Sequence, residues 1–309
     1  MRGLSGKRAV VTGAATGIGW ATALRLAEEG VRVAVIHHGQ ADAADTLLQA
    51  MRPAEGPHLA LDADVADEAA LERAFDAVLA AFGGLELLVA NAATKRINDP
   101  SDYPMADWDA VQGVNLRGAY MTARAFLRRR TGPKGAIVFV SSVHEITPLE
   151  EDIGYAASKA GLAGVTRTLA LAEACRGVRV NNLAPGGVIT PMNPTWTPGS
   201  AVLAGFEAKV PLGRAAQPEE MAGGTVTITN IGALGVDAGT PILNPGESAI
   251  LAFGAVRPQP WVVDGEIVVR EVTQLAMSFD HRLVDGELGS RVLARTGEIL
   301  TDPALALLL

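Results

Sequence analysis

The sequence predicts an α/β fold: a doubly wound parallel sheet in the first two thirds of the chain, followed by a smaller α+β segment. Two observations predict it. Short β-branched runs alternate with longer Ala/Leu-rich stretches up to about residue 222, which implies right-handed crossovers and parallel strands. Hydrophobic residues make up 49% of the 309 residues but aromatic residues only 5%, which suits the aliphatic core of a sheet covered by helices.

The first part of the chain contains six candidate strands. They lie at residues 8–12, 31–36, 58–62, 85–90, 137–140 and 179–183. Helical patterns lie between them, near residues 18–29, 42–51, 67–82, 107–130 and 155–174. Ligands bind at the carboxyl ends of the strands in such sheets, so we expect the functional residues in the loops there.

The alternation stops near residue 222. Pro218 and the acidic residues Glu219 and Glu220 favour the first turn of a helix. Two glycines and a β-branched run at 225–229 follow shortly afterwards, so a long helix is not expected there. Further strands are expected near 248–253 and 266–279, with a last helix from Gly286. We therefore predict two domains, residues 1–222 and 223–309.

Composition excludes several classes of protein. The net charge is -8 and no Lys/Arg-rich run could follow a phosphate backbone, so we expect no nucleic-acid partner. No apolar run approaches the ~18 residues of a membrane span, and the polar start is not a signal peptide. The single cysteine, Cys175, allows no internal disulfide. We expect a cytoplasmic protein without a membrane partner or a metal site.

A glycine-rich loop follows the first strand. Residues 9–19 read Ala-Val-Val-Thr-Gly-Ala-Ala-Thr-Gly-Ile-Gly. Gly13 permits a tight turn, while Gly17 and Gly19 let the backbone approach a pyrophosphate and the helix approach the sheet. Such a loop is weak alone, but the strand before it and the helix after it meet the structural condition for dinucleotide binding.

The G-x-x-x-G-x-G spacing resembles the short-chain dehydrogenase/reductase family, and residues 1–222 carry further motifs in the family's order. Asp64-Val65 resembles the pair that contacts adenine, and Asn91 a residue that stabilises the central sheet. The resemblance implies a Rossmann-like sheet with six of the family's seven strands. It implies that the coenzyme is bound by Gly13, Thr16, Gly17, Ile18, Gly19, His38, Asp64, Val65, Asn91, Tyr155, Lys159, Pro185, Gly186 and Thr190.

The choice of coenzyme stays open between NADP and NAD. An acid at the end of the second strand would bind the ribose hydroxyls and repel a 2′-phosphate. His37 and His38 stand there instead, and they are neither acidic nor firmly basic. The sequence favours NADP slightly, although two ordinary loop histidines are an equal interpretation.

Tyr155 and Lys159 are spaced i and i+4 and so lie on one face of one helix. A tyrosine is a poor base near neutral pH unless a neighbouring cation stabilises its phenolate. Ser142, 13 residues before Tyr155, and Asn115 match the family's other catalytic positions. The resemblance implies that Ser142 holds the substrate oxygen, that Lys159 also holds the nicotinamide ribose, and that Asn115 supports a water relay to Lys159.

Within the family, the runs at 141–145 and 155–159 resemble glucose 1-dehydrogenases most and 3-oxoacyl-acyl-carrier-protein reductases next. The substrate is therefore expected to be a small alcohol or carbonyl compound, a sugar or a hydroxyacyl compound. His144 and Glu145 either contact the substrate or form an ordinary loop pair. We also expect a homo-oligomer.

Residues 223–309 resemble the C-terminal part of the acyltransferase of 2-oxo acid dehydrogenase complexes. The carrying runs are 224–232, 240–245 and 278–286. By that resemblance His281 is the base on a coenzyme A thiol, Asp285 supports it, and Thr229 stabilises an oxyanion. The upstream half of that domain is missing and the family's site forms between trimer subunits, so these residues are expected to be vestigial.

The leading interpretation is thus an NAD(P)-dependent oxidoreductase with a Ser-Tyr-Lys site. The second is acyl transfer or trimer assembly by residues 223–309. The third is an inactive fusion, because an unpaired sixth strand leaves an exposed sheet edge.

Overall fold

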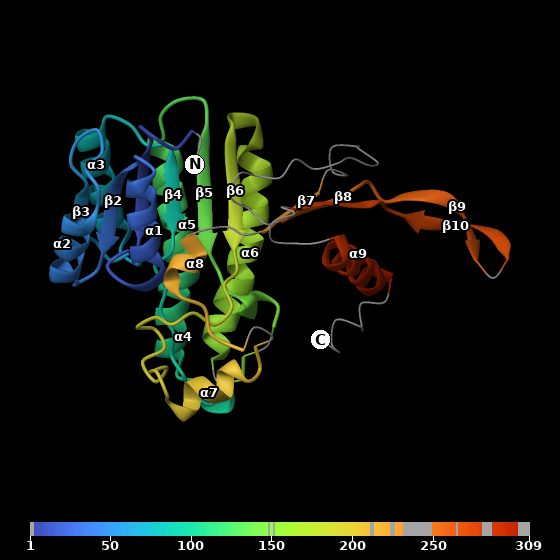
Figure 1. Cartoon of the computed structure of the whole chain (residues 1–309). Helices are drawn as coiled ribbons and strands as arrows, with labels where there is room; N and C mark the ends of the chain where they lie inside the picture. Colours follow the sequence, from blue (N-terminus) through green and yellow to red (C-terminus); the bar gives the residue numbers. More distant parts are fainter. Residues whose placement is uncertain are drawn as a thin grey trace. The chain divides into compact units, whose positions relative to one another are not determined.

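The computed structural model describes residues 3–147, 149–150, 152–210, 213–222, 226–230, 249–263, 265–279 and 286–301. The chain divides into two compact units, Met1–Ala222 and Gly223–Leu309. The first unit contains the six-stranded parallel sheet, and the described residues of the second contain further strands and the helix α9 (Gly286–Thr301) (Figure 1).

The sheet of the first unit has the strand order β3-β2-β1-β4-β5-β6, and all neighbours are parallel. Its strands are β1 (Arg8–Thr12), β2 (Arg32–His37), β3 (Leu59–Asp62), β4 (Leu87–Ala90), β5 (Gly135–Val140) and β6 (Val178–Leu183). The order reverses between β1 and β4, so the loops after these strands diverge and leave a crevice at the carboxyl edge. The predicted doubly wound sheet is confirmed.

Different helices cover the two faces of this sheet (Figure 1). Val11 and Val35 pack with α1 and α2 on one face, while Val10 and Ile36 pack with α3, α5 and α6 on the other. Successive side chains of a strand point to opposite faces, which is why neighbours in β1 and β2 divide this way. The helices are α1 (Gly17–Glu28), α2 (Ala41–Ala50), α3 (Glu68–Phe82), α4 (Met105–Gln112), α5 (Ala119–Arg129), α6 (Ile153–Glu173), α7 (Ala201–Glu207) and α8 (Pro218–Ala222).

The helix predicted over residues 107–130 is present as one continuous helical segment, Met105–Arg129. Its middle, η2 (Gly113–Gly118), is π-helical, and this π-helical turn between α4 and α5 was not predicted. Periodicity cannot show this turn, because apolar residues recur on both sides of it. The turn places Asn115 in the interior, where its side chain is 1% exposed.

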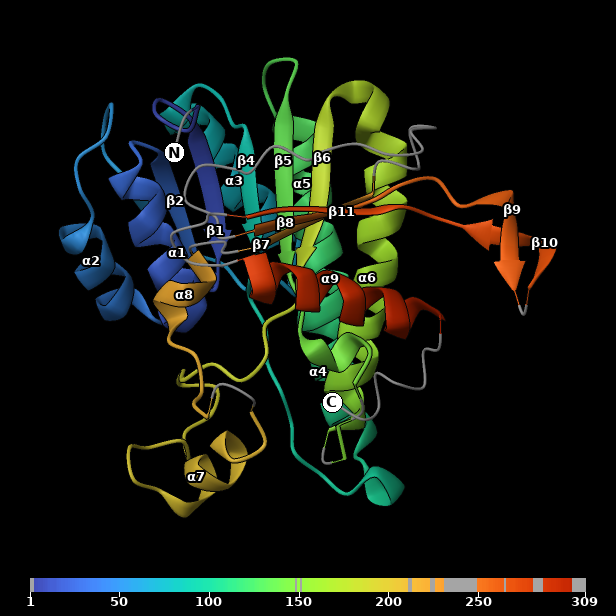
Figure 2. The ribbon, with the colours of Figure 1, turned by 45° about the vertical axis from the view of Figure 1, so that its right-hand side comes forward.

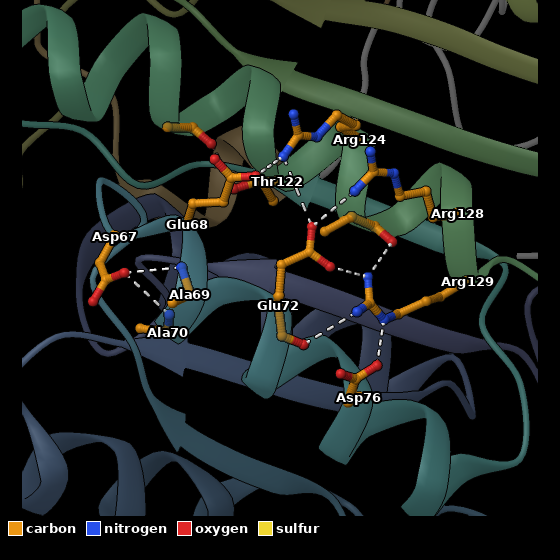
Figure 3. Close-up of polar contacts among 12 residues, drawn as sticks. Asp67, Glu68, Ala69, Ala70, Glu72, Asp76, Thr122, Arg124, Arg128 and Arg129 are labelled. Atoms are coloured by element: carbon orange, nitrogen blue, oxygen red, sulfur yellow. Dashed lines mark hydrogen bonds and ion pairs between the residues drawn. The ribbon is translucent and has the colours of Figure 1, made fainter.

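Charged side chains join α3 to α5 (Figure 3). Arg129 contacts Glu72 at 2.6 Å and Asp76 at 2.7 Å, and Arg124 pairs with Glu68. The hydrogen bond from Arg129 is the main cause that lowers the pKa of the Asp76 carboxyl. The partly exposed pairs add little individually, but as a network they fix the spacing of the two helices.

The second unit contains a three-stranded sheet, β11-β8-β7, and the hairpin β9–β10 (Figure 2). Its elements are β7 (Val226–Asn230), β8 (Ala249–Phe253), β9 (Arg257–Val263), β10 (Glu266–Val272), β11 (Leu275–Phe279) and α9 (Gly286–Thr301). The single strand predicted at 266–279 is wrong, because it is two strands, and β9 was missed. The sequence did not predict β9 because it contains Pro258 and Pro260, and proline argues against a strand assignment.

Candidate active site

A cavity of about 390 Å³ opens at the carboxyl edge of the first unit's sheet. The loops after β1, β4, β5 and β6 form its wall. The predicted site residues that line it are Gly13, Thr16, Gly17, Ile18, Asn91, Ser142, Tyr155, Lys159, Pro185, Gly186 and Thr190. Gly19, His38, Asp64, Val65 and Asn115 are not among the lining residues.

The glycine loop is shaped for close backbone approach. Gly13 and Gly17 have φ angles of 62° and 57°, in the left-handed region that favours glycine. A Cβ atom at Gly13 would lie 2.7 Å from the Ala92 Cα, and one at Gly19 would lie 2.4 Å from the Gly13 carbonyl oxygen. A side chain at either position would therefore push the loop away from β4 or from α1.

Asn91 fastens the end of β4 to the end of β1. Its Nδ2 donates to the carbonyl oxygens of Thr12 and Gly13, each at 3.0 Å, while its own N–H donates to Thr12 Oγ1 at 3.1 Å. These bonds hold the glycine loop in place from beneath. Thr190, from the segment after β6, lies over the loop, since a Cβ on Gly17 would be 3.1 Å from Thr190 Cγ2.

An acidic residue that the sequence analysis missed stands beside His38. Asp62, at the end of β3, accepts hydrogen bonds from the Gly39 N–H, and its Oδ1 lies 3.6 Å from His38 Nδ1. His37 is buried and its Nδ1 accepts from the Gln40 N–H at 3.3 Å. The parallel pairing of β2 with β3 brings Asp62 here, and adjacent strand ends were the available signal.

Asp64 and Val65, which are predicted to contact adenine, both make contacts within the protein. The Asp64 carboxylate accepts the Ala66 N–H at 2.8 Å and closes a tight turn after β3. Val65 is buried, 6% exposed, in the core cluster beneath α3 and α5.

Ser142, Tyr155 and Lys159 converge on the cavity from the β5 loop and from α6. Burial is the main cause that raises the pKa of the Tyr155 phenol, while its hydrogen bond with Ser142 lowers it. The Lys159 Nζ lies 5.4 Å from the centre of the Tyr155 ring and donates to the Val140 carbonyl oxygen at 2.8 Å. Lys159 is 2% exposed, and burial lowers its pKa to about 8, against the opposing effect of the Glu145 charge.

The Asn115 side chain supports the loop after β4. Its Oδ1 accepts the Thr94 N–H and its Nδ2 donates to the Thr94 carbonyl oxygen, both at 2.8 Å. A third bond runs from Nδ2 to Ser158 Oγ at 3.1 Å on α6. Asn115 therefore joins the β4 loop to α6, while its part in a water relay stays a prediction.

Sequence reasoning also missed Asp152, the N-terminal cap of α6. This carboxylate is 0% exposed and accepts hydrogen bonds from the Tyr155 N–H at 2.9 Å, the Arg96 N–H at 2.8 Å and the Tyr103 hydroxyl at 3.0 Å. Burial first and Asp152 second raise the pKa of Tyr103 to about 12. An acidic cap before the Tyr155 helix was the signal that could have found it.

The remaining predicted residues belong to the second unit. Thr229 lies on β7, while His281 and Asp285 lie outside the described residues. Within the described ranges, no group of three or more His, Cys, Asp or Glu side chains could hold a metal ion, and no helix is long and apolar enough to cross a membrane.

Two family profiles match the sequence. Residues 7–201 match the short chain dehydrogenase family, and residues 211–308 match the catalytic domain of the 2-oxoacid dehydrogenases acyltransferase family. The chain is 36% identical to glucose 1-dehydrogenase of Gluconobacter oxydans, over 71% of this chain and 83% of that protein. It is 38% identical to 3beta-hydroxysteroid dehydrogenase 1 of Eggerthella lenta, over 71% of this chain and 85% of that protein.

A solved structure shares the fold of the first unit. A short chain dehydrogenase from Burkholderia cenocepacia, crystallised in complex with NADP, is 35% identical with a TM-score of 0.65. The match covers 71% of this chain and 88% of that chain.

Proposed function

The chain belongs to the short-chain dehydrogenase family of oxidoreductases, and from this membership we propose that Ser142, Tyr155 and Lys159 interconvert an alcohol and a carbonyl compound. The observation that carries the proposal is the convergence of these three side chains on one cavity at the carboxyl edge of the sheet. A phenol, a hydroxyl and a cation in one cavity are the groups that proton transfer at an alcohol oxygen requires.

The site fits a nicotinamide dinucleotide. Gly13, Gly17 and Gly19 leave a cradle that Cβ atoms would fill, and α1 begins in this loop without a side chain that caps its N-terminus. Lys159, Asn91, Pro185, Gly186 and Thr190 line the rest of the wall. The coenzyme supplies or accepts the hydride when bound.

In this proposal, Ser142 donates a hydrogen bond that orients the substrate oxygen. Tyr155 gives its proton to that oxygen during reduction and takes it back during oxidation. Lys159 is mostly protonated at neutral pH because its pKa is about 8, and its charge stabilises the Tyr155 phenolate. Its bond to the Val140 carbonyl oxygen holds the ammonium at the inner wall.

We also propose which coenzymes and which class of substrate the chain binds. His38 tolerates a 2′-phosphate better than an acid would, so both NADP and NAD are expected to bind. The name of one relative, a glucose 1-dehydrogenase, supports a sugar as the substrate, while a hydroxyacyl substrate rests on the motif resemblance. Self-association stays a prediction from the sequence.

Replacing Tyr155 with Phe tests the proposal. The variant removes only the hydroxyl, so kcat should fall at least 100-fold while coenzyme affinity changes less than about twofold. The measurement is coenzyme absorbance with a panel of sugars and hydroxyacyl compounds. Tyr120→Phe is the matched control, because Tyr120 is 42% exposed on α5 and does not line the cavity. Retention of more than a few per cent of kcat in Tyr155→Phe would remove Tyr155 from the reaction.

Acyl transfer by residues 211–308 rests on sequence alone, because His281 and Asp285 lie outside the described residues. We expect no acetyl transfer from this segment, since the groups that would hold the thiol near His281 belong to the missing upstream half.

A further inference from the structure

Tyr155 stands in the first turn of α6, a position where helices tend to fray. Its side chain lines the cavity. A proton donor must keep its hydroxyl within hydrogen-bond distance of the substrate oxygen, so a fraying turn would lower the rate of proton transfer. The first turn of α6 therefore needs anchors outside the helix.

The buried Asp152 carboxylate anchors this turn to the loop after β4. Its Oδ1 accepts the Tyr155 N–H at 2.9 Å, and its Oδ2 accepts the Arg96 N–H at 2.8 Å. The Tyr103 hydroxyl, at 3.0 Å from Oδ1, is a third donor. All three donors are neutral, and Asp152 is 0% exposed. One carboxylate therefore ties together two parts of the chain that are 56 residues apart.

The two parts that Asp152 ties together both border the cavity. Tyr155 lies on α6, and residues 92–95 of the loop after β4 form part of the wall. The same loop reaches the segment after β6, because Lys95 Nζ donates to Asn193 Oδ1 at 2.7 Å. The spacing between the Tyr155 side chain and this wall therefore depends on Asp152.

Gly154, between Asp152 and Tyr155, is packed closely by the same group of residues. A Cβ on Gly154 would lie 2.8 Å from the Tyr103 hydroxyl oxygen, and its carbonyl oxygen accepts Gln112 Nε2 at 2.8 Å. Tyr103 therefore covers the first turn as well as donating to Asp152, so movement of the turn is limited from this side too.

We propose that Asp152 is a positioning residue of the reaction, which holds Tyr155 and the loop after β4 at the spacing that proton transfer requires. Asp152 acts through Tyr155 and does not line the cavity. A misplacement of about 1 Å can lower a rate on the order of 100-fold, so an anchor behind the proton donor can matter as much as a contact with the substrate. The inference rests on the proposed function, because it gives Asp152 a part in the reaction of Tyr155.

Asp152 also acts on Tyr155 through its charge. Burial is the main cause that raises the pKa of the Tyr155 phenol, and the Asp152 carboxylate raises it further. Replacing the carboxylate with an amide should therefore lower the pKa of the phenol, so that Tyr155 becomes a base at lower pH. The other titratable or charged groups around the phenol stay unchanged in such a variant; they are Lys95, Ser142, His144, Glu145 and Lys159.

The test separates the hydrogen bonds from the charge. Asp152→Asn removes the charge but keeps an oxygen that can accept the Tyr155 N–H, whereas Asp152→Ala removes both. Alcohol oxidation at saturating coenzyme is measured across the pH range in which the protein stays folded. We expect kcat to fall about tenfold or more in Asp152→Ala and less than about threefold in Asp152→Asn, with KM little changed in both. The rising limb of the kcat profile of Asp152→Asn should move to lower pH by about half a unit or more.

Asp67→Asn is the matched control. Asp67 caps α3 in a similar way, by accepting the N–H groups of Ala69 and Ala70, and it does not line the cavity (Figure 3). Its kcat and its pH profile should equal those of the wild type. Thermal unfolding gives the folded fraction of each variant, to which the rates are referred.

Two results would overturn the inference. A folded Asp152→Ala variant with kcat within twofold of the wild type would show that the cap serves stability alone. A profile that does not move in Asp152→Asn would show that the carboxylate is not held beside Tyr155.

Titration of Tyr155 makes the inference testable without turnover. The chain has three tyrosines, so in a Tyr103→Phe, Tyr120→Phe background the ultraviolet absorbance follows Tyr155 alone. If the wild-type chain oxidises no alcohol but Asp152→Asn lowers the pKa of Tyr155 in this background, the reaction is refuted and the placement of Asp152 stands. If the wild type turns over but neither the profile nor the titration changes, the placement of Asp152 is refuted and the reaction stands.

Discussion

Lys159 should lower the stability of the free protein below pH 8. Its pKa is lowered from 10.5 to about 8 because the ammonium loses water on burial. Each pKa unit corresponds to about 1.4 kcal/mol, so folding with a charged Lys159 costs about 3 kcal/mol. This cost is a net value that already contains the hydrogen bond to the Val140 carbonyl oxygen. Lys159→Met should therefore stabilise the coenzyme-free chain by as much as about 3 kcal/mol at pH 7.

The destabilisation caused by the buried Lys159 ammonium depends on pH. Below pH 8 both the folded and the unfolded chain carry the proton, so the full cost is present. Between about pH 8 and 10.5 the unfolded chain holds more protons at this group than the folded chain, so raising the pH stabilises the wild type relative to the variant. The stability of Lys159→Met relative to the wild type should thus fall by about 2 to 3 kcal/mol between pH 7 and pH 10.

The test is urea unfolding at both pH values, followed by pulsed hydrogen exchange. Peptides from β1 and β5 report the stability of the first unit separately from that of the second. Lys134→Met controls for the loss of a lysine at an exposed position. A difference between Lys159→Met and the wild type that is equal at pH 7 and pH 10 would refute the reasoning. It would show that the buried ammonium is solvated or paired within the site.

Two further predictions follow from the site. Asp152→Ala should destabilise the first unit by about 3 kcal/mol, because it removes a helix cap and two other buried hydrogen bonds. Asp152→Asn should cost only about 1 kcal/mol, and it should lower the pKa of Tyr103 below 12 in an ultraviolet titration; equal unfolding midpoints for the two variants would contradict this. Asp62→Asn should raise NADP affinity relative to NAD about fivefold, because it removes a carboxylate beside His38 that opposes a 2′-phosphate. Fluorescence titration with each coenzyme measures the ratio, and an unchanged ratio would place the 2′-phosphate elsewhere.

The parallel sheet was predictable because each strand is a short aliphatic run between helices of ordinary length. The glycine loop was predictable because its glycines are required by the local geometry. Gly13 and Gly19 occupy points where no side chain fits. Ser142, Tyr155 and Lys159 could be located because their types and spacing resemble those of the family: Tyr155 and Lys159 share a helix, and Ser142 lies in the loop that follows β5.

The missed residues depend on contacts between distant parts of the chain. Lys95 and Asn193 are 98 residues apart, and nothing local in either segment indicates that they meet. Asp62 acquires its place beside His38 only when β2 and β3 pair. The Asn115 side chain was assigned a chemical role, whereas its bonds to Thr94 and Ser158 show that it also holds two elements together.

The π-helical turn of Gly113–Gly118 changes the direction in which side chains point around the helix axis between α4 and α5. In an α-helix each residue turns the chain by about 100°, so one residue more or fewer swings every later side chain by that angle. The wider turn contains such an extra residue and lets α4 and α5 each face their own neighbours while Asn115 points inward. Removing one residue here would therefore rotate one helix against the other by about 100°. The length of this segment therefore fixes how α4 and α5 face their neighbours, just as the Asn115 side chain fixes the β4 loop against α6.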